Sequence, residues 1–279
     1  LLFVHFASFF IKDVESIFLI RQAAGNELEV KNYPVGTRGG NSGVCPTQNL
    51  VDAYEYIGAQ TLNPYENRDP RLSATIVTNG SSWNGVSDFD QSQKGQFNQK
   101  AKGASKTGYY LKKFLASNLN LVEGGNADHI WVAYRYAEVL LNYAEAMNEA
   151  YGPDADPKGF GMTARDALME VRNSASTALP IVSAASREDF RNAVKAERRV
   201  ELAFEDHRYW DLLRWKDAVS VLNKPIKGMV IKKNNIGGYV YSTTTVSTRN
   251  FEEKQYYLPF SREELSNSNG ALVQNPLYN

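Results

Sequence analysis

The sequence contains little cysteine and little histidine, and this scarcity excludes several kinds of site. Its one cysteine, Cys45, excludes an intramolecular disulfide framework and any zinc site built from several cysteines. The three histidines, His5, His129 and His207, are too scattered along the chain for their spacing to indicate a metal site. The sequence therefore predicts no metal ligands.

The chain also lacks net charge and long apolar runs. Lys and Arg total 31, as do Asp and Glu, which argues against general attraction to nucleic acid or to anionic lipid. The longest apolar run, residues 1–11, is too short to span a bilayer and has no basic residues or cleavage site of a signal peptide. We expect it to form a buried helix or strand, and a chain that opens inside such a run resembles a piece of a longer protein.

Familiar catalytic and cofactor motifs are missing as well. There is no nucleophile elbow, phosphate loop, dinucleotide fingerprint or HExxH metal motif. The glycine-rich stretch at residues 36–43 lacks the lysine of a phosphate loop, and Asp88 and Asp90 lack the pattern of a calcium loop. The sequence therefore predicts no cofactor.

What the sequence does contain is a globular composition that is rich in aromatic residues. Of the 279 residues, 43% are apolar, 22% charged and 12% aromatic. Three regions differ in texture: residues 1–128 are rich in turn signals, residues 129–222 are helical, and residues 223–279 are irregular. We predict one domain, in which a helical scaffold carries a loop-rich part, with a strand in the Tyr, Thr and Ser run at residues 239–248.

The helical region carries apolar stripes with helical spacing. One stripe steps by three and four residues from near His129: Ile130, Tyr134, Ala137, Leu141, Ala144 and Asn148. Thr163 and Ser186, each followed three residues later by Asp, are expected to cap two further helices. A break is expected between Asp206 and Trp210. Short connections imply antiparallel hairpins, although the helix starts do not repeat at a fixed spacing.

The densest signal is a set of acidic residues interleaved with arginine. Glu197, Glu201 and Glu205 are spaced to share one helix face, and Arg198 and Arg208 are each three residues from an acid. Carboxylates one turn apart are near the separation that a retaining glycosidase uses. Because neighbouring arginines lower a carboxyl pKa, whereas a catalytic acid needs a raised one, we favour a structural ion-pair network.

A tryptophan in a polar loop offers a different chemistry. Trp83 lies among Asn79, Asn84 and Asp88, and an exposed indole ring with hydrogen-bonding neighbours suits the apolar face and hydroxyl edge of a sugar. The alternative is that Trp83 only anchors its loop in the core. We predict that these four residues bind a glycan.

Five stretches together resemble the SusD/RagB family of bacterial outer-membrane nutrient-binding lipoproteins. The longest are YRYAEVLLNYAEA and ERRVELAFEDHRYWDLLRW. The stretches lie at residues 46–52, 67–72, 134–146, 197–215 and 274–276. The resemblance covers roughly residues 14–279, and we expect the family's lipoprotein signal and most of its N-terminal helices to have no counterpart in this chain.

The resemblance implies a mainly α-helical fold, with helical hairpins of tetratricopeptide type, a large loop-rich subdomain and a few short strands. It also implies a protein on the outer surface of Bacteroidetes cells, anchored by a lipid that lies outside this chain. Such proteins are not enzymes. They capture oligosaccharides together with a SusC-like TonB-dependent transporter. A helical scaffold that binds only protein and a glycoside hydrolase remain the alternatives.

Overall fold

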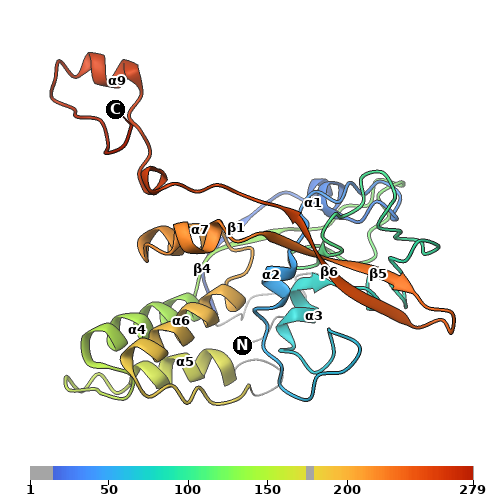
Figure 1. The fold of residues 1–279 in the computed structure, drawn as a ribbon, viewed down its shortest axis with the longest axis horizontal. Coiled ribbons are helices and arrows are strands. Elements are labelled where there is room, and N and C mark those ends of the chain that lie inside the picture. Colours follow the sequence, from blue (N-terminus) through green and yellow to red (C-terminus); the bar gives the residue numbers. More distant parts are fainter. Residues whose placement is uncertain (1–14, 174–178, 279) are drawn as a thin grey trace.

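The computed structural model describes residues 15–173 and 179–278, so the element predicted at residues 1–11 lies outside the described residues. Within them the fold is mainly α-helical, and the strands form three two-stranded sheets (Figure 1). This confirms the predicted fold class. No helix in these two ranges is long and apolar enough to cross a membrane.

The elements follow one another in mixed order along the chain. The helices are α1 (Glu27–Asn32), α2 (Gln48–Val51), α3 (Arg71–Thr75), α4 (Tyr136–Tyr151), α5 (Ala164–Asn173), α6 (Arg187–Glu201), α7 (Arg208–Arg214), α8 (Ala218–Leu222), the 3-10 helix η1 (Glu253–Tyr256) and α9 (Arg262–Asn267). The strands are β1 (Ser16–Arg21), β2 (Ile76–Val77), β3 (Tyr110–Leu111), β4 (Ile130–Arg135), β5 (Ile226–Lys233) and β6 (Tyr239–Ser247).

Helices α4, α5 and α6 pack together around one core, with α4 in contact with both of the others (Figure 1). Their facing sides bury Leu141, Leu168 and Phe190 completely, while small alanines fill the space between the helix backbones. The predicted helix starts are confirmed by their caps. The Ser186 hydroxyl accepts from the Asp189 N–H at 3.0 Å, and Thr163 hydrogen-bonds with Asp166.

The start of the first long helix differs from the prediction. Residues 130–135 form strand β4, which pairs antiparallel with β1, and α4 begins only at Tyr136. Aromatic and β-branched residues such as Trp131 and Val132 favour a strand, and the pairing with β1 stabilises the strand over the helix. Much of this sheet stays exposed: Ile17 and Phe18 of β1 retain 55% and 59% of their surface.

The predicted break after the third long helix comes earlier than expected. Helix α6 ends at Glu201, and the chain turns through left-handed backbone conformations at Phe204 (φ 64°) and Asp206 (φ 65°) before α7 begins at Arg208. Neither residue can continue a right-handed helix in that conformation. The residues on either side of the turn therefore no longer share one helix face.

The loop-rich region has a small core of its own and packs against the β5–β6 hairpin (Figure 1). Strand β6 confirms the strand predicted at residues 239–248, and its first residue, Tyr239, pairs with Lys233 at the end of β5. Gln99 ties the loops to this hairpin by accepting from the Ile231 N–H and donating to the Met229 carbonyl. The hairpin thus holds one edge of the loop region in place.

Candidate functional site

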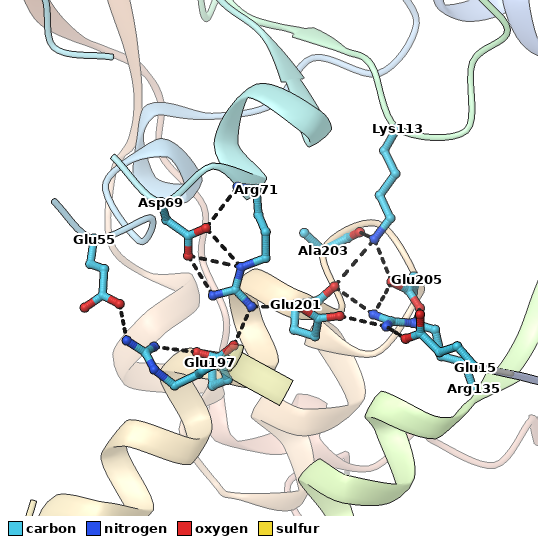
Figure 2. Close-up of polar contacts among 11 residues, drawn as sticks. Glu15, Glu55, Asp69, Arg71, Lys113, Arg135, Glu197, Glu201, Ala203 and Glu205 are labelled. Carbon is cyan, nitrogen blue, oxygen red and sulfur yellow. Dashed lines mark hydrogen bonds and ion pairs between the residues drawn. The ribbon is translucent and has the colours of Figure 1, made fainter. Parts of the chain in front are cut away.

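The predicted acidic cluster is a buried ion-pair network, shown in Figure 2. Glu201 lies between two arginines: Arg71 of α3 donates to it at 2.8 Å and Arg135 of β4 at 2.7 Å. Only 5% of the Glu201 surface remains exposed. Because α3, β4 and α6 are distant in the sequence, this one carboxylate joins three parts of the chain.

Glu197 extends the network on one side. It pairs with Arg71 and, at 2.8 Å, with Arg172 of α5, whose guanidinium also contacts Glu55. Arg71 is itself held by Asp69, which accepts from it through both carboxylate oxygens. Such bidentate pairing fixes the guanidinium plane and satisfies its buried donors.

Glu205 extends the network on the other side. It accepts from Arg135 at 2.7 Å and from the Lys113 ammonium at 2.6 Å. Lys113 also donates to the carbonyl of Ala203 at 3.0 Å, in the turn after α6. Arg135 in addition reaches Glu15 at 2.5 Å. The turn that ends α6 is therefore anchored by charge as well as by backbone conformation.

The electrostatics of these carboxyls favour a structural role. Burial acts to raise the pKa of Glu201, but Arg135 and Arg71 outweigh it and hold that pKa at about 2. The pKa of Glu205 is also lowered, because Lys113 and Arg135 offset its burial. A general acid in glycoside hydrolysis needs a carboxyl with a raised pKa. Neither glutamate meets that requirement.

Two pairings expected from sequence spacing are wrong. Arg198 does not reach Glu201; it forks onto Asp211 of α7 at 3.0 and 3.1 Å and donates to Asn142. Arg208 does not pair with Glu205, because the left-handed turn between them breaks the helical spacing. Arg198 thus ties α6 to α7, and Arg208 lies outside the network.

The prediction of an exposed ring at Trp83 is wrong as well. The side chain is only 7% exposed and packs edge-on against Tyr33, with ring centroids 5.3 Å apart. Asn84 (φ 54°) and Gly85 (φ 76°) form a tight turn that lets Trp83 and Val86 pair through their backbones. This turn folds the indole into the core of the loop region, as the alternative interpretation held.

The polar neighbours of Trp83 divide into two kinds. Asn79 is buried and braces the loop, accepting from the Gln91 N–H at 2.9 Å and donating to the Tyr241 hydroxyl at 3.2 Å. Asn84 accepts from the Asn118 N–H, so its side-chain oxygen also supports backbone. Asp88 alone of the four predicted residues is exposed.

Asp88 contributes to a surface cluster that we call the tyrosine patch: Tyr65, Asp88, Lys233, Tyr239 and Tyr241. The Tyr239 hydroxyl donates to Asp88 at 3.1 Å, and the Lys233 ammonium lies 5.2 Å from the centre of the Tyr239 ring. The Tyr241 ring lies 6.2 Å from that of Tyr239 and 5.4 Å from that of Tyr65. All three tyrosines are partly exposed.

The chemistry of the tyrosine patch is that of a polar ligand site. Burial and the neighbouring carboxylates of Asp88 and Asp90 raise the pKa of Tyr239, so its hydroxyl stays protonated and able to donate. Ring faces beside a carboxylate and an ammonium combine apolar contact with hydrogen bonds of both directions. Among the described residues, no group of His, Cys, Asp and Glu could hold a metal ion.

Sequence reasoning missed Tyr239 and Tyr241 as site residues. The strand prediction for this segment contained the signal, because a period of two places both side chains on one face of β6. The contact with Asp88 joins residues 151 positions apart, and no local pattern reveals it.

Comparisons with known proteins agree with the fold. The model of the SusD family matches residues 18–278. The SusD-like protein P2 of Formosa agariphila is 27% identical over 172 residues, which make up 61% of this chain and 29% of that protein.

Two crystal structures from Bacteroides fragilis are similar to this chain. A SusD-like protein is 26% identical, with a TM-score of 0.76, covering 95% of this chain and 54% of its own. A SusD-like carbohydrate binding protein is also 26% identical, with a TM-score of 0.68, covering 90% of this chain and 53% of its own.

The chain thus spans about half the length of these solved relatives and less than a third of the F. agariphila protein. The match with the family model runs through α4 to α7 and through the loop region with its hairpin, and so includes both the ion-pair network and the tyrosine patch. The chain belongs to the SusD family.

Proposed function

We propose that the chain belongs to a cell-surface protein that binds oligosaccharides and passes them to a TonB-dependent transporter of the outer membrane. Membership of the SusD family supports this proposal, as does the carbohydrate binding stated for one solved relative. The proposed protein is a binding protein without catalytic activity, held at the outer membrane through a lipid anchor. Recognition by a SusC-like transporter is part of the same proposal.

The observation that carries the glycan proposal is the pairing of Tyr239 with Asp88 at the surface. The hydroxyl and the carboxylate of this pair lie beside two further tyrosine rings. A sugar ring has C–H bonds on its face and hydroxyls at its edge, and it matches aromatic faces flanked by donors and acceptors. The tyrosine patch takes the role that the sequence gave to Trp83.

The test is calorimetric titration of the protein with a panel of neutral oligosaccharides, followed by variants. For a glycan that binds, Tyr239→Ala is expected to weaken affinity by about tenfold, since it removes a ring and a hydroxyl. Tyr257→Ala is the matched control: Tyr257 is 56% exposed and lies outside the patch. Equal affinity for the wild type and the Tyr239 variant, with both folded, would refute the assignment of the site.

The exposed apolar side chains of β1 favour a second function, a scaffold that binds only protein. Ile17, Phe18 and Ile20 of this strand have about half of their surface exposed, and clustered exposed apolar side chains are typical of protein interfaces. A flat glycan panel together with co-purification of a transporter would favour this function over the first.

A further inference from the structure

A cavity beside α6 and α7 belongs neither to the ion-pair network nor to the tyrosine patch. Its volume is about 250 Å³. The residues that line it come from α6, α7 and two loops: Ala53, Lys195, Ala196, Arg199, Arg208, Trp215 and Asp217. Three of them carry positive charge and one carries negative charge.

The positive charges in this cavity are incompletely paired. Asp217 accepts from Lys195 at 2.7 Å. Arg199 donates to the backbone carbonyl of Asn49, which carries no charge. Within residues 15–173 and 179–278, no carboxylate oxygen lies within 4.0 Å of the guanidinium of Arg199 or Arg208. The cavity therefore presents two guanidinium groups that form no salt bridge with the described residues.

The two arginines also repel each other. Burial and the nearby charge of Arg199 together lower the pKa of Arg208 to about 10, although Asp211 and Asp217 act to raise it. Burial lowers the pKa of Arg199 as well. A half-buried cation without a partner is costly, and an anion between two such cations removes that cost.

The cavity also has an aromatic residue in its lining, Trp215. The indole N–H of Trp215 donates to Glu145 at 2.8 Å, and the Arg214 guanidinium lies 4.7 Å from its ring centre. Lys195 lies 4.9 Å from the same ring. These contacts hold the ring in place before any ligand arrives, which limits the entropy that binding would lose.

We propose that this cavity binds an oxyanion, a carboxylate or a sulfate group carried by a small molecule, between Arg199 and Arg208. The guanidinium fork matches both kinds of group, because it can offer two parallel N–H donors to two oxygens. The volume of about 250 Å³ admits the charged group with a few further atoms, which would lie against Trp215. The proposal is independent of the tyrosine patch.

The experiment is calorimetric titration of the wild-type protein with sodium sulfate and with sodium glucuronate, in chloride buffer of constant ionic strength. Both anions are expected to bind saturably, with dissociation constants on the order of 1 mM, and to compete with each other, while neutral glucose does not compete. Tighter binding of glucuronate would show that the site prefers a carboxylate carried by a sugar, and tighter binding of sulfate would show that it prefers the sulfate group; either result supports an oxyanion site.

Arg208→Gln is expected to weaken both anions by about tenfold, because it removes a charged hydrogen-bond donor from the cavity. Arg191→Gln is the matched control, since Arg191 lies on the same helix but pairs with Glu149 outside the cavity. Thermal unfolding shows whether each variant is folded. Absence of saturable binding by both anions, or equal affinity for wild type and Arg208→Gln, would overturn the proposal.

Discussion

The ion-pair network and the tyrosine patch use polar side chains in opposite ways. In the network, Glu201 is buried and each of its carboxylate oxygens meets an arginine. In the patch, Asp88 is exposed and accepts a hydrogen bond from the hydroxyl of Tyr239. A buried, fully paired charge cannot accept a ligand without losing its partners, whereas an exposed pair can exchange one neutral partner for another. The density of charged residues in the sequence is therefore a poor guide to the binding site that we propose.

A second contrast lies within the arginines. Arg71 meets Asp69, Glu197 and Glu201, and these carboxylates raise its pKa even though burial acts to lower it. Arg208, also withdrawn from solvent, has a lowered pKa. Arg71 is thus fully paired within the ion-pair network, whereas Arg208 can still pair with an anion that enters the cavity.

The largest effect is expected at the core of the loop region. Trp83→Ala removes a buried ring that contacts Tyr33, and we expect it to lower the free energy of unfolding by about 3–5 kcal/mol. Urea unfolding measures this change. Val240→Ala, on the exposed side of β6, is the control and should change little. A loss below about 1 kcal/mol for Trp83→Ala would show that the ring is not part of a packed core.

The next effect concerns the network. Glu201→Gln keeps the side-chain shape but leaves Arg71 and Arg135 without a shared anion, and it should lower the free energy of unfolding by about 3 kcal/mol. Chemical denaturation measures it, with Glu188→Gln at the exposed start of α6 as the control. Sugar release that the wild type shows and a folded Glu201→Gln variant lacks would instead favour a hydrolase.

Acid should weaken the network in a defined range. Because the pKa of Glu201 falls from 4.5 to about 2 on folding, its contribution to stability is present above pH 4.5 and is lost as the pH falls toward 2. Between pH 5 and pH 3 this amounts to about 2 kcal/mol. Glu201→Gln should show a shallower loss over the same range in urea unfolding, and identical slopes for the two proteins would contradict the assignment.

A smaller effect is expected at the tyrosine patch. Tyr239→Phe keeps the ring and removes the hydroxyl that donates to Asp88, so a bound glycan should lose about 1 kcal/mol of binding free energy, roughly fivefold in affinity. Titration of the folded variant measures it. If the hydroxyl does not contribute, Tyr239→Phe will bind as the wild type does while Tyr239→Ala still loses affinity.

The smallest effect is expected for an exposed ion pair. Arg191 and Glu149 pair across the surface of α6 and α4, and solvent screens their attraction. Arg191→Gln should therefore change the free energy of unfolding by no more than about 0.5 kcal/mol. If Arg191→Gln lowered the free energy of unfolding as much as Glu201→Gln does, buried and exposed ion pairs would not differ in their contribution to stability.

The sequence predicted what depends on local spacing. Local spacing alone predicted the helix caps at Ser186 and Thr163 and the strand β6, because caps and strand periods involve neighbouring residues. Strand β4 could not be predicted in this way, because its apolar residues also fit the spacing of a helix. Only the pairing with β1 selects the strand.

The candidate site was less predictable for the same reason. The structural role of Glu201 followed from nearby arginines, although its real partners, Arg71 and Arg135, are 130 and 66 residues away. The buried Trp83 ring packs against Tyr33, and Asp88 becomes part of a candidate site only through its hydrogen bond with Tyr239. These long-range contacts arise only when the hairpin and the loops fold together.

Our expectation is that a glycan contacts the tyrosine rings of β6 while Trp83 stays buried in the core of the loop region. Its most direct test is nuclear magnetic resonance of the folded protein, with labelled tyrosine rings and tryptophan indoles, during titration with a glycan that binds. We expect the Tyr239 and Tyr241 signals to shift and the Trp83 indole signal to stay constant. A shifting Trp83 signal with unchanged Tyr239 and Tyr241 would contradict it.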